Sequence, residues 1–292
     1  MNPTASLVAT SSPLIFQDVV KAQQGGDDAL SLAFFELANA EIVGFRLSAV
    51  HLKKNARDLV ISARQDSSAS SGDHTGKIVW ETSYLLLNFL LARGDKLGKI
   101  LEVGAGCGLL GQVLAASKYA KKVVLTECDA VMENLERNVE RNESVLAKNK
   151  DKPLAVARQL NWLSPRKDMA RFPKDLQEQS FDTIVGTDVV YTPSLVEPLL
   201  STLRIMAHDK TIVYLCLQIR CEDSHKLLLR LASEHHWKVN DISQELSSMP
   251  SCSWGLDMEC KLLKLTTTDL QQTKKRKSSS TPEAAPGKHG KR

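Results

Sequence analysis

Glycine residues gather in one short stretch of the chain, residues 101–112, which reads LEVGAGCGLLGQ. A glycine has no Cβ atom, so backbone N–H groups can come close to a bound ligand and positive φ angles cost little. Two overlapping patterns occur there: G-x-G-x-x-G at Gly106, Gly108 and Gly111, and E-x-G-x-G-x-G at Glu102, Gly104, Gly106 and Gly108. The first pattern is the signature of dinucleotide binding. The register that the chain uses therefore decides which cofactor is expected.

The strand that leads into the glycines decides between the two patterns. The apolar run KILEV ends at Val103, so Gly104 is the residue at the turn. The dinucleotide signature places its first glycine directly after the strand, but here it would begin two residues late and leave Gly104 and Ala105 unexplained. The second register favours S-adenosylmethionine over NAD, with Glu102 and Ala105 as parts of the cofactor-binding turn. A glycine-rich turn that binds no ligand is the alternative.

An acidic residue ends the next expected strand, KKVVLTE, at Glu127. A carboxylate in that place can accept hydrogen bonds from both ribose hydroxyls of a nucleotide-like cofactor. NAD enzymes use the same arrangement, so Glu127 does not discriminate between the cofactors, and an exposed carboxylate at a strand end is the structural alternative. Asp129 lies beyond the strand end and is more typical of a helix cap.

The segment TDVVYTP, residues 187–193, does discriminate. It follows an apolar run, so Asp188 and Tyr191 are expected at the carboxyl edge of the sheet, beside the glycine turn. A carboxylate and an aromatic hydroxyl form a polar corner in which an amine could be held, and hydride transfer has no evident need of one. Tyr191 could equally be a packing residue whose hydroxyl finds a backbone partner.

Strand and helix patterns alternate through the part of the chain that must position these residues. The expected strands are KILEVG, KKVVLTE, AVARQLNW, FDTIVGTDVVY and TIVYLCLQ, and the helical stretches include 109–119, 130–144, 194–206 and 222–236. Continuous apolar runs are typical of strands buried on both faces. The order predicts an α/β fold of the Rossmann-like type with a mostly parallel sheet. Two last segments, WKVNDIS and ECKLLKLTT, predict an antiparallel finish and bring the sheet to seven strands.

The ends of the chain differ from this periodic part. Alternating patterns in residues 41–52 and 57–65 predict an N-terminal β-hairpin. We divide the chain into a lead-in of residues 1–39, a domain of residues 40–268 that includes the hairpin, and a basic tail of residues 269–292. The tail is expected to be disordered and separable from the chemistry, because its composition cannot bury a core.

Charge and cysteine content limit the possible partners. The formal net charge is +4, but residues 271–292 contribute seven Lys or Arg and one Glu, so the rest of the chain is mildly acidic. This charge does not support nucleic-acid binding by residues 1–270, while the tail's KKRK could touch RNA or act as a nuclear import signal.

The six cysteines include no C-x-x-C pair and no zinc-ligand spacing, so no metal site is expected. We expect a cytoplasmic protein, with nuclear entry through the tail as a second location, and no membrane segment.

Several of these motifs, in this order, resemble family 16 of the seven-strand methyltransferases. The segments that carry the resemblance are VWETSYLLLNFL, ILEVGAGCGLLG, VVLTE, LNW and FDTIVGTDVVY, within residues 40–267. The family includes the protein-lysine methyltransferases of the methyltransferase-like 21 group. The loop at 66–76 and the stretch at 164–180 look longer than in that family, and both are expected near the place where a protein substrate would dock.

The resemblance implies roles for individual residues. Trp80 corresponds to the tryptophan beside the methionine end of the cofactor, Trp162 to the one near the adenine, and Thr187 to the small residue that closes the pocket. Glu127 stands where an aspartate is more usual, and Asp188 with Tyr191 matches the D-x-x-Y motif. Either tryptophan could instead be a core residue.

The implied activity is S-adenosylmethionine-dependent methylation of a lysine side chain. The resemblance implies a non-histone protein acceptor, such as a chaperone, an AAA ATPase or an elongation factor, and a monomeric enzyme. Two alternatives stay open: methylation of a small molecule, an arginine or a glutamine, and an interaction module whose working part is the basic tail.

Overall fold

A seven-stranded sheet forms the centre of the computed structural model, which describes residues 12–22, 29–53, 56–66, 75–146 and 154–268. Its strands are β4 (Gly98–Val103), β5 (Ala120–Glu127), β6 (Ala155–Gln159), β7 (Phe181–Thr187), β8 (Ala207–Gln218), β9 (Trp237–Asp241) and β10 (Cys260–Thr267). They lie in the order β6-β5-β4-β7-β8-β10-β9. The strands from β6 to β8 are parallel, and β10 is antiparallel to both β8 and β9. The prediction of a mostly parallel sheet with an antiparallel finish is confirmed.

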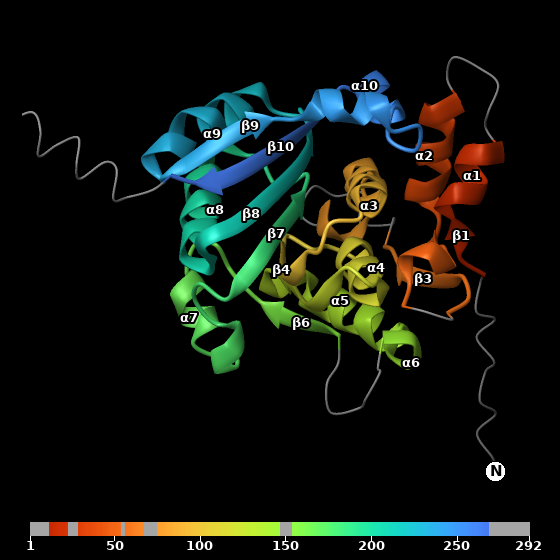
Figure 1. The fold of residues 1–292 in the computed structure, drawn as a ribbon, viewed down its shortest axis with the longest axis horizontal. Helices are drawn as coiled ribbons and strands as arrows, with labels where there is room; N and C mark the ends of the chain where they lie inside the picture. Colours follow the sequence, from red (N-terminus) through yellow and green to blue (C-terminus); the bar gives the residue numbers. More distant parts are fainter. Residues whose placement is uncertain (1–11, 23–28, 54–55, 67–74, 147–153, 269–292) are drawn as a thin grey trace, which may run out of the picture.

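Helices cover both faces of this sheet (Figure 1). They are α3 (Glu81–Arg93), α4 (Leu109–Ala116), α5 (Asp129–Arg141), α6 (Glu143–Leu146), α7 (Pro165–Met169), α8 (Pro193–Met206), α9 (Glu222–Glu234) and α10 (Trp254–Asp257). Among the described residues, four short 3-10 helices occur at Ala49–His51, Thr75–Lys77, Lys174–Leu176 and Ser243–Ser248.

Alternate side chains of the central strands serve two separate cores. Ile100 of β4 and Val123 of β5 pack in one apolar cluster with α3, α4 and α5. Their neighbours Leu101 and Val124 point to the opposite face and pack in a second cluster with α8 and α9. Because successive side chains of a strand alternate between faces, a strand covered on both sides must be apolar throughout. This explains the continuous apolar runs in the sequence.

The N-terminal hairpin is also confirmed and has a third strand. Strands β2 (Ile42–Leu47) and β3 (Leu59–Arg64) are antiparallel, and β1 (Leu14–Ile15) pairs with β2 in parallel. Helices α1 (Phe16–Ala22) and α2 (Ala29–Asn39) follow β1.

The part of the lead-in that the structure describes packs on the main core. The Phe16 ring of α1 stacks on Tyr84 of α3 with centroids 4.5 Å apart, and Phe34 of α2 lies 5.0 Å from Trp254 of α10. Figure 1 shows α2 beside α10, although the two helices are more than 200 residues apart in the sequence. The predicted tail lies outside the described residues.

One predicted strand is shorter than expected, with a consequence for the site. The pattern AVARQLNW extends to Trp162, but β6 ends at Gln159. The chain turns there because the buried Asp168 carboxylate accepts a hydrogen bond from the Asn161 backbone N–H at 2.8 Å. Trp162 is thereby placed in a turn at the carboxyl end of the sheet.

The described residues include no candidate for a membrane-spanning helix, because none of their helices combines the necessary length and apolar character.

Candidate functional site

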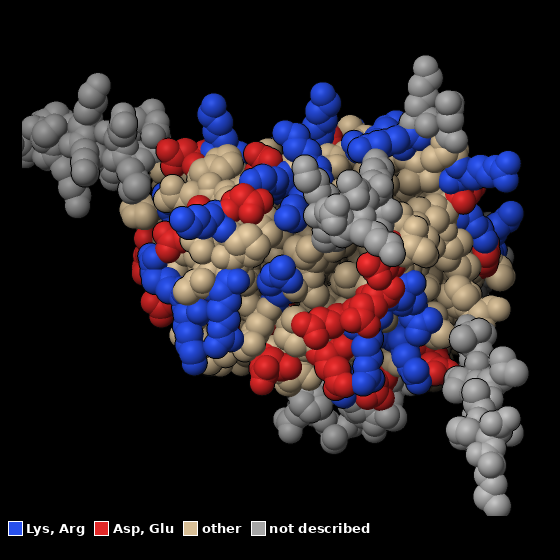
Figure 2. Space-filling view, turned by 90° about the horizontal axis from the view of Figure 1, so that it is seen from below, with Lys and Arg blue, Asp and Glu red and all other residues tan. Residues whose placement is uncertain are grey.

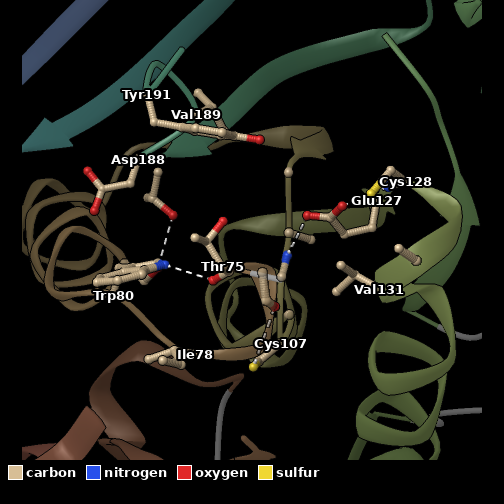
Figure 3. A pocket seen from close by; sticks show the side chains of 18 of the residues that line it. Thr75, Ile78, Trp80, Cys107, Glu127, Cys128, Val131, Asp188, Val189 and Tyr191 are labelled. Carbon is tan, nitrogen blue, oxygen red and sulfur yellow. Dashed lines mark hydrogen bonds between the residues drawn. The ribbon is translucent and has the colours of Figure 1, made fainter. Parts of the chain in front are cut away.

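A cavity of about 310 Å³ opens at the carboxyl ends of β4, β5 and β7. Ten of the eleven residues predicted for the site line it: Trp80, Gly104, Ala105, Gly106, Gly108, Glu127, Trp162, Thr187, Asp188 and Tyr191. Figure 3 shows Asp188 and Trp80 at one end of the cavity and Glu127 at the opposite end. Parallel strands bring all of these residues except Trp80 together, because the carboxyl ends of the strands meet at one edge of the sheet. Trp80 reaches the cavity from the start of α3.

The glycine turn has the backbone conformation that its sequence pattern requires. Gly104, Gly106 and Gly108 have φ angles of +63°, +55° and +74°. The Ala105 N–H donates to the Thr126 carbonyl at 2.9 Å, and the Gly108 N–H donates to the Ala105 carbonyl at 2.7 Å. These bonds anchor the turn to β5 and close it into the start of α4. The three positive φ angles agree with the E-x-G-x-G-x-G register.

The segment that precedes α3 covers this turn. A Cβ atom on Gly106 would lie 2.9 Å from the Gly76 carbonyl oxygen, so the two backbones approach as closely as glycine permits. The Trp80 indole N–H donates to the Thr75 carbonyl at 3.0 Å and fixes the tryptophan at the start of α3. Thr75 and Gly76 line the cavity as well. They form one of its walls, which the sequence pattern did not indicate.

Glu127 ends β5 with its carboxylate turned toward the glycine turn. One oxygen accepts a hydrogen bond from the Gly106 N–H at 3.1 Å and the other from the Cys128 N–H at 2.7 Å (Figure 3 draws the first). Burial raises the pKa of this carboxyl group, and the two N–H donors oppose that rise. The carboxylate is thus held at the cavity wall, with oxygen lone pairs left for ligand hydroxyls.

Glu102 is the predicted cofactor residue that does not line the cavity. Its side chain is buried, and one carboxyl oxygen accepts a hydrogen bond from the Gly111 N–H at 2.9 Å. A Cβ atom on Gly111 would clash with that same oxygen, so Gly111 is required by Glu102. Glu102 therefore contacts the first turn of α4, the helix that follows the glycine turn. Gly111, the last residue of the dinucleotide pattern, has a packing role here.

Burial raises the pKa of Glu102 to about 8, so this carboxyl group is protonated in the folded protein at neutral pH. Because the folded state binds its proton more tightly than the unfolded chain, we expect the free energy of unfolding to fall as pH rises from about 5 to 8. The loss approaches about 1.4 kcal/mol per pH unit. Glu102→Gln should remove most of this slope, as measured by urea denaturation at pH 5.5, 7 and 8.5. Equal slopes for the variant and the wild-type protein would contradict the buried protonated state.

Asp188 lies directly after β7 with a φ angle of +50°, unusual for a residue other than glycine. Its side chain is only 7% exposed, and its Oδ1 atom accepts a hydrogen bond from the Gln218 N–H at 2.8 Å. Burial raises the pKa of Asp188 to about 6, against the lowering effects of that N–H group and of Arg220. At neutral pH the carboxylate is thus mostly ionised, and it carries negative charge into a buried part of the site.

The remaining predicted residues form the walls and the roof of the cavity. The Thr187 hydroxyl hydrogen-bonds the Ser83 hydroxyl at 2.9 Å, which ties the end of β7 to the first turn of α3. Tyr191 is 48% exposed. Its ring lies across the cavity with the hydroxyl directed toward Glu127 rather than Asp188 (Figure 3). Tyr191 thus covers the site between its two ends, and its hydroxyl points away from the Asp188 carboxylate.

Sequence reasoning missed contacts made by residues far from the motifs. They are Thr75, Gly76 and Ser83 before and within α3, Cys128 and Val131 at the start of α5, and Val189, which with Trp162 crowds Gly104. Arg220, just beyond β8, lies against two residues that line the cavity. The glycine at position 76 in an otherwise polar loop was the one available signal for close backbone approach.

The cavity fits a nucleoside-type cofactor such as S-adenosylmethionine. The glycine turn offers space that a Cβ atom on Gly104 would fill, since it would lie 2.8 Å from Val189 and 3.4 Å from the Trp162 ring. Glu127 supplies carboxylate oxygens beside this turn, as a ribose requires, and Trp162 supplies an aromatic surface. The volume also lies at the lower end of the range for small-molecule sites. These residues would hold the cofactor along the carboxyl edge of β4 and β5.

Comparison with known proteins agrees with this geometry. A family model described as lysine methyltransferase matches residues 56–234. The protein-lysine methyltransferase METTL21E of Mus musculus is 29% identical over 183 residues, which cover 61% of this chain and 68% of the relative. The protein N-lysine methyltransferase METTL21A of Danio rerio is 30% identical over 156 residues, 53% of this chain and 66% of the relative.

A third relative, a putative methyltransferase-like protein 21E pseudogene of Homo sapiens, is 30% identical over 61% of this chain and 62% of its own length. The matched segments thus span about two thirds of the length of these relatives. The glycine turn, Glu127 and Asp188 all lie within the family match.

Proposed function

This chain belongs to the lysine methyltransferase family, and from that premise we propose that it methylates the side-chain amine of a lysine in a non-histone protein. The cofactor is S-adenosylmethionine. The observation that carries the acceptor assignment is the buried Asp188 carboxylate, which stands at the end of the cavity opposite Glu127. A cationic acceptor can be recognised there, because Asp188 and Glu81 share the single Arg220 guanidinium and the three groups together keep a net negative charge.

The chemistry sets two tasks for the residues of the site. When bound, S-adenosylmethionine supplies an electrophilic methyl group on a positively charged sulfonium. The acceptor must reach that methyl group as a neutral amine, and deprotonation of a lysine with a pKa near 10.4 costs about 4.6 kcal/mol at pH 7. Burial and the positive charge of the cofactor both lower the pKa of the amine. The site must therefore first capture the amine and then hold it in line in a dry cavity.

Asp188 suits capture and orientation rather than general-base chemistry, because an ionised carboxylate stabilises an ammonium and opposes its deprotonation. Tyr191 and Trp80 suit the exclusion of water, since Tyr191 covers the cavity and Trp80 lies at one of its ends. Glu127 and the glycine turn suit cofactor binding.

Surface charge near the cavity supports a cationic acceptor. Helix α5 begins at the cavity and exposes four carboxylates and two guanidinium groups. Figure 2, a view from below, shows acidic side chains gathered in one region of the surface with Lys and Arg side chains beside them. A surplus of carboxylates such as that on α5 favours the approach of a positively charged segment.

We also propose that the protein works in a reducing compartment, the cytoplasm, with entry to the nucleus if the basic tail acts as an import signal. All six cysteines are free thiols in the structure, which supports such a compartment. We also propose that the protein is a monomer that acts on a protein and not on nucleic acid, since the part of the chain before residue 271 is mildly acidic.

The acceptor can be identified with a cell extract. The purified protein is incubated with the extract and isotopically labelled S-adenosylmethionine, and labelled peptides are read by mass spectrometry. Label on a lysine of a chaperone, an AAA ATPase or an elongation factor is the expected result. Label confined to arginine, glutamine or a small molecule would overturn the acceptor assignment.

Cofactor choice gives a separate prediction. Isothermal titration calorimetry should detect binding of S-adenosylhomocysteine, the demethylated product, and no binding of NAD at micromolar concentrations. The reason is the register of the turn, which places glycines at 104, 106 and 108 directly after β4. Micromolar NAD binding without binding of S-adenosylhomocysteine would contradict the cofactor.

A further inference from the structure

Three charged side chains meet at the end of the cavity where the acceptor is proposed to enter. The Arg220 guanidinium lies 3.1 Å from the Glu81 carboxylate and 3.6 Å from the Asp188 Oδ2 atom. The Glu81 side chain is 19% exposed, whereas the Arg220 side chain is 39% exposed. One cation is therefore shared between two carboxylates at the edge of a buried region.

Trp80 supports the guanidinium from a third direction. The Arg220 Cζ atom lies 4.4 Å from the centroid of the Trp80 ring, within the range of a cation–π contact. Trp80 itself lines the cavity. Arg220 is thus fixed by three residues that come from the start of α3 and the end of β7.

We propose that Arg220 is a positioning residue of the acceptor site, whose guanidinium, held on Trp80 and shared with Glu81, keeps the Asp188 carboxylate ionised and oriented for an incoming ammonium. This inference rests on the proposed lysine acceptor. Asp188 Oδ1 is occupied by the Gln218 N–H, whereas Oδ2 has no hydrogen bond to any residue that the structure describes. Oδ2 is buried and faces Arg220, and it lacks the hydrogen bond that an incoming ammonium could donate.

The charges at this point do not cancel. Two carboxylates and one guanidinium leave a net negative charge, which a second cation can neutralise. Arg220 thereby lowers the cost of burying Asp188 in the absence of an acceptor, while the surplus charge still favours a lysine. An arginine suits this role because it stays protonated at any working pH and stacks on an aromatic ring.

Other groups that face Asp188 do not contribute charge. The Cys216 thiol of β8 and the Cys260 thiol of β10 both lie near it, and burial raises the pKa of each, to about 12 for Cys260. Both thiols are neutral at physiological pH. The Thr82 hydroxyl, at the start of α3, is also close enough to lower the pKa of Asp188.

Glu81 and Arg220 act on Asp188 in opposite directions, and this gives the inference a sharp test. The guanidinium lowers the pKa of Asp188, and the Glu81 carboxylate raises it. Replacing Arg220 by a neutral residue must therefore raise the titration midpoint of Asp188, and replacing Glu81 must lower it. A purely structural role for Arg220 predicts no such pair of opposite shifts.

The experiment is a ¹³C NMR titration of the full chain labelled at the aspartate carboxyl carbons, without an acceptor. Asp188→Asn identifies the signal, and the variants are Arg220→Gln, Arg220→Lys and Glu81→Gln. We expect the midpoint to rise by about one pH unit in Arg220→Gln, to fall in Glu81→Gln, and to stay near the wild-type value in Arg220→Lys. An unchanged midpoint in both Arg220→Gln and Glu81→Gln would overturn the proposal.

A kinetic arm uses the ratio of each variant's kcat/KM to the wild-type value at several pH values, because the ionisation of the acceptor cancels in this ratio. The Arg220→Gln ratio should rise from pH 6 to 8.5, and the Arg220→Lys ratio should be flat. Two flat ratios would contradict the proposal. If the wild-type protein labels no lysine, the proposed function fails, while the NMR titration still decides the role of Arg220. If Arg220→Gln does not fold, Glu81→Gln and Arg220→Lys still test it.

Discussion

Gly104→Val should reduce the affinity for S-adenosylhomocysteine at least about 100-fold while the protein remains folded. A Cβ atom at this position would lie 2.8 Å from Val189, and the added methyl groups would fill the space beside Trp162. The φ angle of +63° is also unfavourable for a β-branched residue. Both effects act on the turn that we propose to bind the cofactor. Calorimetry with S-adenosylhomocysteine measures the loss, and circular dichroism confirms the fold.

Gly94→Val is the matched control for this variant. Gly94 ends α3 with a φ angle of +68°, so the same substitution imposes a similar backbone strain. It does not line the cavity, and a Cβ atom there would meet only the Tyr119 ring at ordinary contact distance. We expect Gly94→Val to lose stability and to keep cofactor affinity. If both variants bind the cofactor like the wild-type protein, the turn that holds it lies elsewhere.

The fold could be predicted because its strongest signals are local. The apolar runs around residues 100 and 124 mark strands buried on both faces, and the turn directly after Val103 fixes the glycine register. The sheet edge then follows from the rule that parallel strands meet at their carboxyl ends. Nine of the eleven predicted residues reach one cavity for this reason, and Trp80 joins them from the start of α3.

The remaining features depend on contacts between distant segments, which a local pattern does not encode. Gly76 touches the glycine turn across 30 residues of sequence, and Arg220 reaches Glu81 from 139 residues away. Glu102 was assigned to the cofactor by its place in the motif, but its side chain points to α4 because its position on the strand faces the helix layer. Successive side chains along β4 point to opposite faces of the sheet, and the sequence motif does not show which face each one occupies.

Asp188→Asn and Glu127→Ala should separate the two ends of the site. Asp188→Asn removes the charge that we propose to hold the amine. We therefore expect kcat/KM for the protein acceptor to fall by a factor that corresponds to about 2 to 4 kcal/mol, with cofactor affinity within a few-fold. Glu127→Ala removes the carboxylate beside Gly106 and should raise the cofactor Kd first. Steady-state kinetics with the purified acceptor and calorimetry with S-adenosylhomocysteine measure the two effects.

Asp188→Ala is the informative companion, because position 188 has a φ angle of +50° that asparagine tolerates better than alanine. Both substitutions remove the carboxylate, so both should lower kcat/KM to a similar extent, while alanine alone should also lower the melting temperature. A loss of activity that follows stability rather than charge would mean that Asp188 only shapes the backbone after β7. If folded Asp188→Asn methylates lysine at the wild-type rate, the amine must enter by another route.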